Sequence, residues 1–179
     1  MKWSELLKAQ ADDTYGAAEG LLRHLSDDEL DWKPETGSNW LTVGQLVLHL
    51  TNACGASCRG FVTGDWGMPA EAMENMSMED MLPPAEKFPT ATSIASVRNL
   101  LEEDRELMHR TIAEAGEDRL ANEKSTAPWD PRPVPLGQQL LGMVTHLGNH
   151  QSQLFYYLKL MGKPVNTMDL YGLGAPEKA

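Results

Sequence analysis

Residues 136–161 read LGQQLLGMVTHLGNHQSQLFYYLKLM, a pattern that predicts one long amphipathic helix. Gly162 follows it and Pro164 lies just beyond, which are typical signals for the end of a helix. Apolar residues occupy one broad side: Leu140, Val144, Leu147, Leu154, Phe155 and Leu158. Polar residues mark the other: Thr145, Asn149, Ser152, Tyr156 and Lys159. His146 and His150 lie at the border between these two sides.

The two border histidines have the spacing of a metal-binding pair. Residues four apart on a helix project side by side, so His146 and His150 could share one ion. A third imidazole could come from His49, which lies in the apolar run 46–50 of another predicted helix. Three imidazoles and water form an open site for zinc, nickel, manganese or iron. In the alternative interpretation, the pair is only the polar edge of a packed surface.

The same spacing occurs in the zinc peptidases that carry His-Glu-x-x-His on a helix. Those enzymes need the glutamate as a general base. This chain has Leu147 at that position, which argues against a peptidase of that kind.

The rest of the chain predicts an all-α fold built as a four-helix bundle. The first helix is expected from Ser4 to His24, and the second from Thr42 to 63–64. The third is expected to start at Thr92 or Ser93 and to end before Gly116. A capping box, Ser26 to Glu29, predicts a short turn between the first two. The long connection 64–89 lets the third helix run parallel to the second.

The segment 127–135 contains four prolines in nine positions. Proline lacks the backbone N–H and restricts the residue before it, so the segment cannot be helical. We expect a rigid loop that leads into the last helix.

The apolar stripe of the third helix also places Asp104 on its inward face. A buried carboxylate needs a partner, so Asp104 could orient a metal-bound imidazole or sit beside the pocket as a general base. Alternatively, it is an edge carboxylate paired with Arg105 or with water.

Five further residues are candidates to line a substrate pocket. Gln139, Gln153 and Tyr157 share the border of the last helix with the histidines, although such residues are also common on a helix surface. Trp40 and Trp129 precede the second and fourth helices and could wall one end of the bundle, or simply anchor their loops. His24 and His109, by contrast, are expected to be solvated.

Length, composition and charge limit the functions to consider. The 179 residues with 41% hydrophobic content fit a single domain, 1–179. A net charge of -11 opposes binding to nucleic acid or to an anionic membrane surface. The chain shows neither an apolar signal core nor an 18-residue apolar run, so a cytoplasmic location is expected. Cys54 and Cys58 are then expected to be reduced.

Four segments carry a resemblance to a known family: 25–34 (LSDDELDWKP), 39–50 (NWLTVGQLVLHL), 146–153 (HLGNHQSQ) and 160–164 (LMGKP). Together they resemble the DinB-like superfamily of four-helix-bundle metalloproteins, which includes bacterial thiol S-transferases. The resemblance implies an up-down-down-up bundle, a metal site at His49, His146 and His150, and a homodimer. This chain departs from the family pattern at Gln151, where many members have arginine.

These observations leave several functional hypotheses. The first is a metal-dependent transferase that joins a low-molecular-weight thiol to a small electrophile. A metal-dependent hydrolase acting on a small molecule is the second, and a non-catalytic metal-binding stress-response module is the third. The last is a helical interaction protein whose histidines bind nothing.

Overall fold

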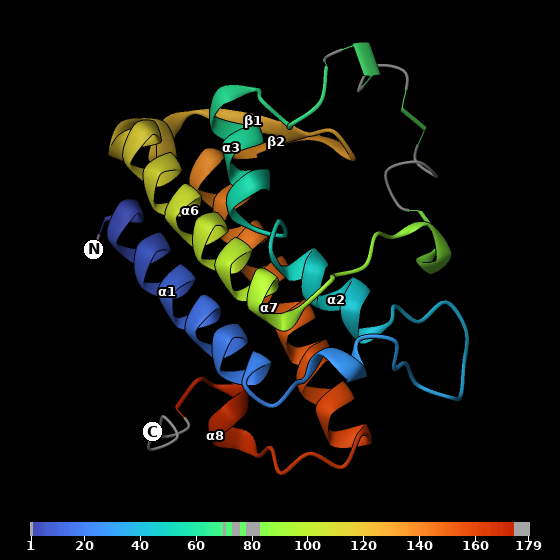
Figure 1. Ribbon diagram of the computed structural model, residues 1–179. Coiled ribbons are helices and arrows are strands. Elements are labelled where there is room, and N and C mark those ends of the chain that lie inside the picture. The colour runs from blue at the N-terminus through green and yellow to red at the C-terminus, as the bar shows by residue number, and fades with distance from the viewer. Residues whose placement is uncertain (1, 70, 73–75, 78–82, 174–179) are drawn as a thin grey trace.

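The computed structural model describes residues 2–69, 71–72, 76–77 and 83–173, and most of them are helical (Figure 1). The long elements are α1 (Trp3–Leu22), α6 (Ile94–Asn122) and α7 (Leu136–Leu160). The shorter ones are η1 (Asp27–Glu29), α2 (Val43–Leu50), α3 (Gly55–Thr63), η2 (Ala85–Lys87), β1 (Lys124–Ala127), β2 (Asp130–Pro135) and α8 (Thr167–Leu170).

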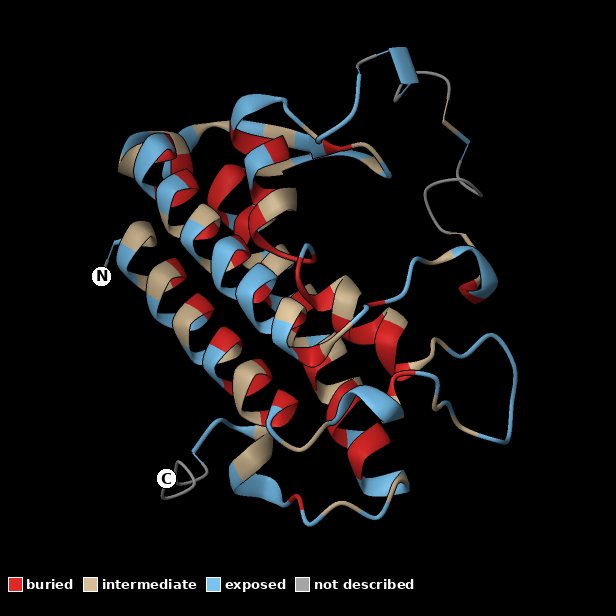
Figure 2. Ribbon diagram, viewed as in Figure 1, coloured by how far each residue is buried: buried red, intermediate tan, exposed pale blue. Residues whose placement is uncertain are grey.

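The core lies where the long helices meet. α1 packs against both α6 and α7, and α3 packs against the other side of this pair. Buried residues line the inward face of each helix, while exposed residues cover the outward faces (Figure 2). The expected helical class is broadly confirmed, whereas the up-down-down-up bundle order stays a prediction. Within the described ranges, no helix combines the length and the apolar character needed to cross a membrane.

Local capping signals start several of these elements as predicted. The Thr42 hydroxyl accepts the Gln45 N–H, and the Gln45 side chain accepts the Thr42 N–H, which together begin α2. Ser26 and Glu29 form the same box at η1. The predicted end of the third helix is confirmed: at Gly116 the backbone leaves the helical conformation with φ 67°, a region open to glycine, and a second helical segment, included in α6, then continues to Asn122.

The second predicted helix is interrupted. α2 ends at Leu50 and α3 begins at Gly55, so one continuous helix from Thr42 to Gly64 is wrong. The cause lies on α6, where the Asp104 carboxylate accepts the N–H groups of Gly55 and Ala56. Cys54 and Cys58 beside the interruption are buried free thiols, in agreement with the expected reduced state.

The proline-rich segment forms a strand rather than a loop. β2 pairs antiparallel with β1, with Lys124 opposite Pro135 and Ser125 opposite Val134. Prolines occur at every second position of β2, and between two of them the Arg132 N–H donates to the Asp130 carboxylate at 3.0 Å. A strand with one neighbour tolerates proline in this way.

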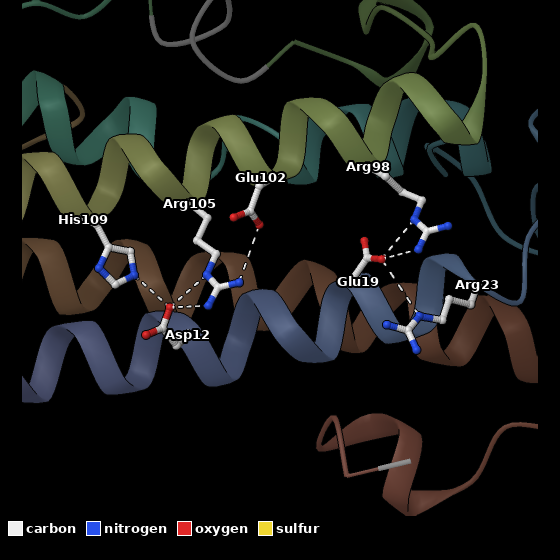
Figure 3. Close-up of polar contacts among 7 residues, drawn as sticks. All are labelled: Asp12, Glu19, Arg23, Arg98, Glu102, Arg105 and His109. Carbon is white, nitrogen blue, oxygen red and sulfur yellow. Dashed lines mark hydrogen bonds and ion pairs between the residues drawn. The ribbon is translucent and has the colours of Figure 1, made fainter. Parts of the chain in front are cut away.

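Ion pairs join the outer faces of α1 and α6 (Figure 3). Asp12 on α1 accepts from Arg105 Nε at 2.9 Å and lies 2.8 Å from His109 Nε2. Further along the same two helices, Glu19 on α1 accepts a hydrogen bond from Arg98 on α6. Arg105 is therefore paired with Asp12 rather than with Asp104, and His109 is a half-buried neighbour of Asp12 rather than a solvated residue.

Candidate metal centre

Three of the five histidines meet between α2 and α7. His49 lies in the last turn of α2, and His146 and His150 lie one turn apart in the middle of α7. One nitrogen from each ring lies within 4.8 Å of the others. The His49 ring centroid is 4.5 Å from that of His150 and 5.4 Å from that of His146. The sequence predicted this grouping, and the structure brings the three residues together.

A backbone carbonyl determines which nitrogen of His146 carries its proton. His146 Nδ1 lies 3.2 Å from the carbonyl oxygen of Ala53, in the interruption between α2 and α3. A carbonyl can only accept a hydrogen bond, so Nδ1 carries the proton of the neutral ring. The lone pair of His146 is therefore on Nε2.

A chain of three hydrogen bonds determines the same for His150. The Tyr157 hydroxyl donates to the carbonyl of Leu41 at 3.0 Å, so it accepts from Gln153 Nε2 at 3.3 Å. The other end of that amide, Gln153 Oε1, then faces His150 Nδ1 at 3.1 Å and accepts a hydrogen bond from it. The lone pair of His150 is also on Nε2.

The two Nε2 atoms face each other at 2.9 Å. With both ring protons on Nδ1, this contact sets one lone pair against another, which is repulsive unless a cation lies close to both. A metal ion relieves the repulsion and uses both lone pairs. The donor set of His49, His146 and His150 therefore fits a divalent metal.

Burial keeps the three rings neutral. Burial first, and then the charges of His150 and His146, lower the pKa of His49 from 6.5 to about 4. Burial also lowers the pKa values of His146 and His150, although their hydrogen bonds to Ala53 and Gln153 oppose the change. Neutral imidazole is the form that binds metal, so the rings do not need to lose a proton at pH 7.

The segment around η2 covers His49. The ring of Phe88 stands edge-on to that of His49, with centroids 5.8 Å apart. Gln45, one turn before His49 on α2, donates to the carbonyls of Ala85 and Phe88 and so ties this segment to the helix. The connection between α3 and α6 thus contributes Phe88 to the site.

The predicted pocket residues lie in different surroundings. Gln153 and Tyr157 belong to the hydrogen-bond chain of His150, and Trp40 packs edge-on against Tyr157 at 6.2 Å. Gln139, two turns before His146, instead donates to the carbonyl of Ser125 in β1. A role for these residues in binding substrate stays a prediction.

Trp129 and Asp104 both lie away from the imidazoles. Trp129 packs against Phe61 of α3 and against Trp66, so it does not share an end of the molecule with Trp40. Asp104 binds the start of α3, and none of the hydrogen bonds found among the described residues joins it to an imidazole.

Gln151, the position at which the chain departs from the family that it resembles, does not face the histidines. Its side chain is buried and donates to the carbonyl of Leu170 at 2.9 Å. It therefore connects α7 to α8. The departure alters a contact between helices rather than the group of imidazoles.

The fold and the site together define a helical protein with three histidines suited to a divalent metal. The family model of the DinB superfamily matches residues 10–154, so the chain belongs to the DinB superfamily. Comparisons with curated proteins and with solved structures find no match.

Replacement of Tyr157 by phenylalanine tests the hydrogen-bond chain of His150. The Tyr157→Phe variant leaves the Leu41 carbonyl without its donor and lets the Gln153 amide rotate, so His150 loses its fixed tautomer. Loss of such an outer partner costs roughly 10- to 100-fold in metal affinity. We expect a decrease in this range in a titration with Zn²⁺. Tyr156→Phe is the matched control, since Tyr156 is exposed; equal losses in both variants would contradict the tautomer argument.

Proposed function

We propose that the protein is a metal-dependent enzyme whose ion is held by His49, His146 and His150. The observation that carries this proposal is the 2.9 Å contact between His146 Nε2 and His150 Nε2. Both rings have their Nδ1 protons committed to acceptors, so their lone pairs converge on one place. Only a cation makes that arrangement favourable, and burial, which lowers the pKa values of the rings, disfavours a proton.

The protein would hold the ion through three neutral nitrogen donors. A divalent ion bound in this way lowers the pKa of a coordinated thiol or water toward neutrality. The residues around the donors keep them oriented: the Ala53 carbonyl holds His146, and the chain from Gln153 through Tyr157 to Leu41 holds His150. The ring of Phe88 packs edge-on against that of His49.

Among the reactions open to such a site, we favour transfer of a low-molecular-weight thiol to a small electrophile. A thiolate is already a strong nucleophile, so this reaction does not need a general base. Within the described residues, the hydrogen-bond partners of His146 and His150 are a carbonyl, an amide and one another, with no carboxylate among them. The resemblance to the group that includes thiol S-transferases points the same way. Hydrolysis of a small molecule is the alternative.

Metal analysis followed by an activity screen tests this proposal. Protein purified without an affinity tag should contain about one equivalent of a divalent metal, or take it up after chelation. The loaded protein should then consume thiols in the presence of small electrophiles, and the chelated protein should not. Hydrolysis without consumption of thiol would favour the alternative reaction. Failure to bind any divalent metal would overturn the proposal, and metal binding without either reaction would indicate a non-catalytic module.

A further inference from the structure

A buried carboxylate on α6 binds the backbone at the interruption between α2 and α3. Asp104 on α6 accepts the N–H of Gly55 through Oδ2 at 2.9 Å, and that of Ala56 through Oδ1 at 2.8 Å. The first N–H groups of a helix have no partner inside it, and the helix dipole favours a negative charge there. Cys54, the residue before α3, offers no side-chain cap of its own. Asp104 therefore provides the cap from another helix.

Tyr15 completes this arrangement from α1. Its hydroxyl donates to Asp104 Oδ2 at 2.6 Å and accepts the Gly55 N–H at 3.2 Å. Both side chains are buried, with exposed fractions of 2% for Tyr15 and 5% for Asp104. Burial raises the pKa of Tyr15, so the hydroxyl keeps the proton that it donates. Burial also raises the pKa of Asp104, and the hydrogen bonds from Tyr15 and from the start of α3 oppose that rise.

Gly55 makes the close approach of the two helices sterically feasible. A Cβ atom at this position would lie 2.1 Å from the backbone oxygen of Asp104, which is far inside van der Waals contact. Only glycine therefore allows the start of α3 to rest on the backbone of α6. The interruption therefore depends on two features: the absence of a side chain at Gly55 and the carboxylate of Asp104.

The interruption also supplies the partner of a metal-binding histidine. In an unbroken helix, the Ala53 carbonyl would accept the N–H of the residue four positions later. Here α2 closes with the N–H of Asn52 donating to the His49 carbonyl at 3.2 Å, and Ala53 O instead faces His146 Nδ1 at 3.2 Å. The carbonyl that sets the tautomer of His146 is available because the helix breaks at this point.

We infer that Asp104 and Tyr15 are positioning residues for the metal site, acting through the backbone at residues 53–56 to hold the Ala53 carbonyl against His146. The inference rests on the proposed metal site. It assigns to Asp104 a role at a distance: the carboxylate touches neither an imidazole nor a substrate, and it acts on the ligand geometry through the start of α3. A cap that only stabilised the fold would leave the ligand geometry unchanged.

The chain contains a matched control for this effect. Glu117, also on α6, accepts the N–H groups of Trp3 and Ser4 at the start of α1, at 2.8 and 3.1 Å. This is the same chemistry, one carboxylate on the first two N–H groups of another helix, but α1 carries none of the three histidines. Glu117→Gln should therefore lower stability without affecting the metal site.

Titration of metal-free protein with Co²⁺, followed by visible absorption, tests the inference. Asp104→Asn should weaken Co²⁺ binding about tenfold or more, the loss typical of an outer-shell partner, and should shift the visible bands as His146 loses its orientation. Tyr15→Phe leaves the two backbone contacts of Asp104 in place, so it should fold and show a smaller change in the same direction. Glu117→Gln should match wild type in affinity and spectrum.

The outcomes separate this inference from the proposed function. A wild-type protein that binds neither Co²⁺ nor any other divalent metal overturns both. A wild-type protein that binds Co²⁺, together with folded Asp104→Asn and Tyr15→Phe variants of unchanged affinity and spectrum, overturns the inference alone. If Asp104→Asn does not fold, the test rests on Tyr15→Phe. A Co²⁺ spectrum of Tyr15→Phe identical to that of wild type then contradicts the inference.

Discussion

Alanine in place of any one of His49, His146 or His150 is expected to remove the metal and, with it, any metal-dependent activity. Each ring supplies one of three protein donors, and no described carboxylate or thiol joins the group as a substitute. Loss of an outer partner already costs roughly 10- to 100-fold in affinity, so loss of a donor should cost roughly 100-fold or more. Elemental analysis of the purified variants should then find well under one equivalent of metal.

Thermal unfolding provides an independent measurement of the same loss. A ligand that binds only the folded state stabilises it by about 2.7 kcal/mol when the free concentration is 100 times Kd. Added Zn²⁺ should therefore raise the melting temperature of wild-type protein and leave that of the three variants almost unchanged. His24→Ala is the matched control, because His24 lies near Asp169 and outside the cluster. Full metal content in all three variants would exclude the site.

The sequence predicts these three residues because the information for their grouping is local. A spacing of four residues on α7 places His146 and His150 side by side whatever the rest of the chain does. The capping box at Thr42 likewise starts α2 from neighbouring residues. The apolar run around His49 then predicts that its helix packs in the core, where it meets α7.

The interruption after α2 escaped prediction because its cause is 49 residues away. No proline marks residues 50–55, and the apolar pattern continues through them into α3. The helix breaks because Gly55 meets Asp104, a contact that exists only after α6 has packed against this segment. The Ala53 carbonyl was missed for a related reason, since a backbone oxygen carries no signal in the choice of amino acid.

The contrast between Gln153 and Gln139 shows a second limit. Both lie on the same face of α7 as the histidines, so periodicity assigns them to one group. Gln153 does contact His150, whereas Gln139 meets the β hairpin that the prolines of segment 127–135 concealed. Helical spacing identifies a face correctly, but it does not identify which element covers each turn of that face.

Acidification should destabilise the metal-free protein in a window set by its buried histidines. His49 has a pKa near 4 in the folded state against 6.5 as its ordinary value. Between these two values the unfolded chain binds a proton that the folded chain does not, so the free energy of unfolding falls as the pH falls. His49 alone should remove about 2 kcal/mol between pH 7 and pH 5. The lowered pKa values of His146 and His150 add to the loss in the same direction.

Urea unfolding of chelated protein at pH 7, 6 and 5 measures this loss. Protonation of carboxylates with lowered pKa values, such as Glu29 and Glu117, also destabilises the folded protein. This loss falls mostly at lower pH, because the ordinary pKa of these groups is 4.5. Between pH 7 and pH 5, the histidines therefore account for most of the loss of stability. His49→Gln removes the titrating group and should flatten the dependence on pH by the share of His49. A wild-type protein equally stable at pH 7 and pH 5 would show that the three rings are not held neutral, and the explanation of the Nε2 contact would then fail with it.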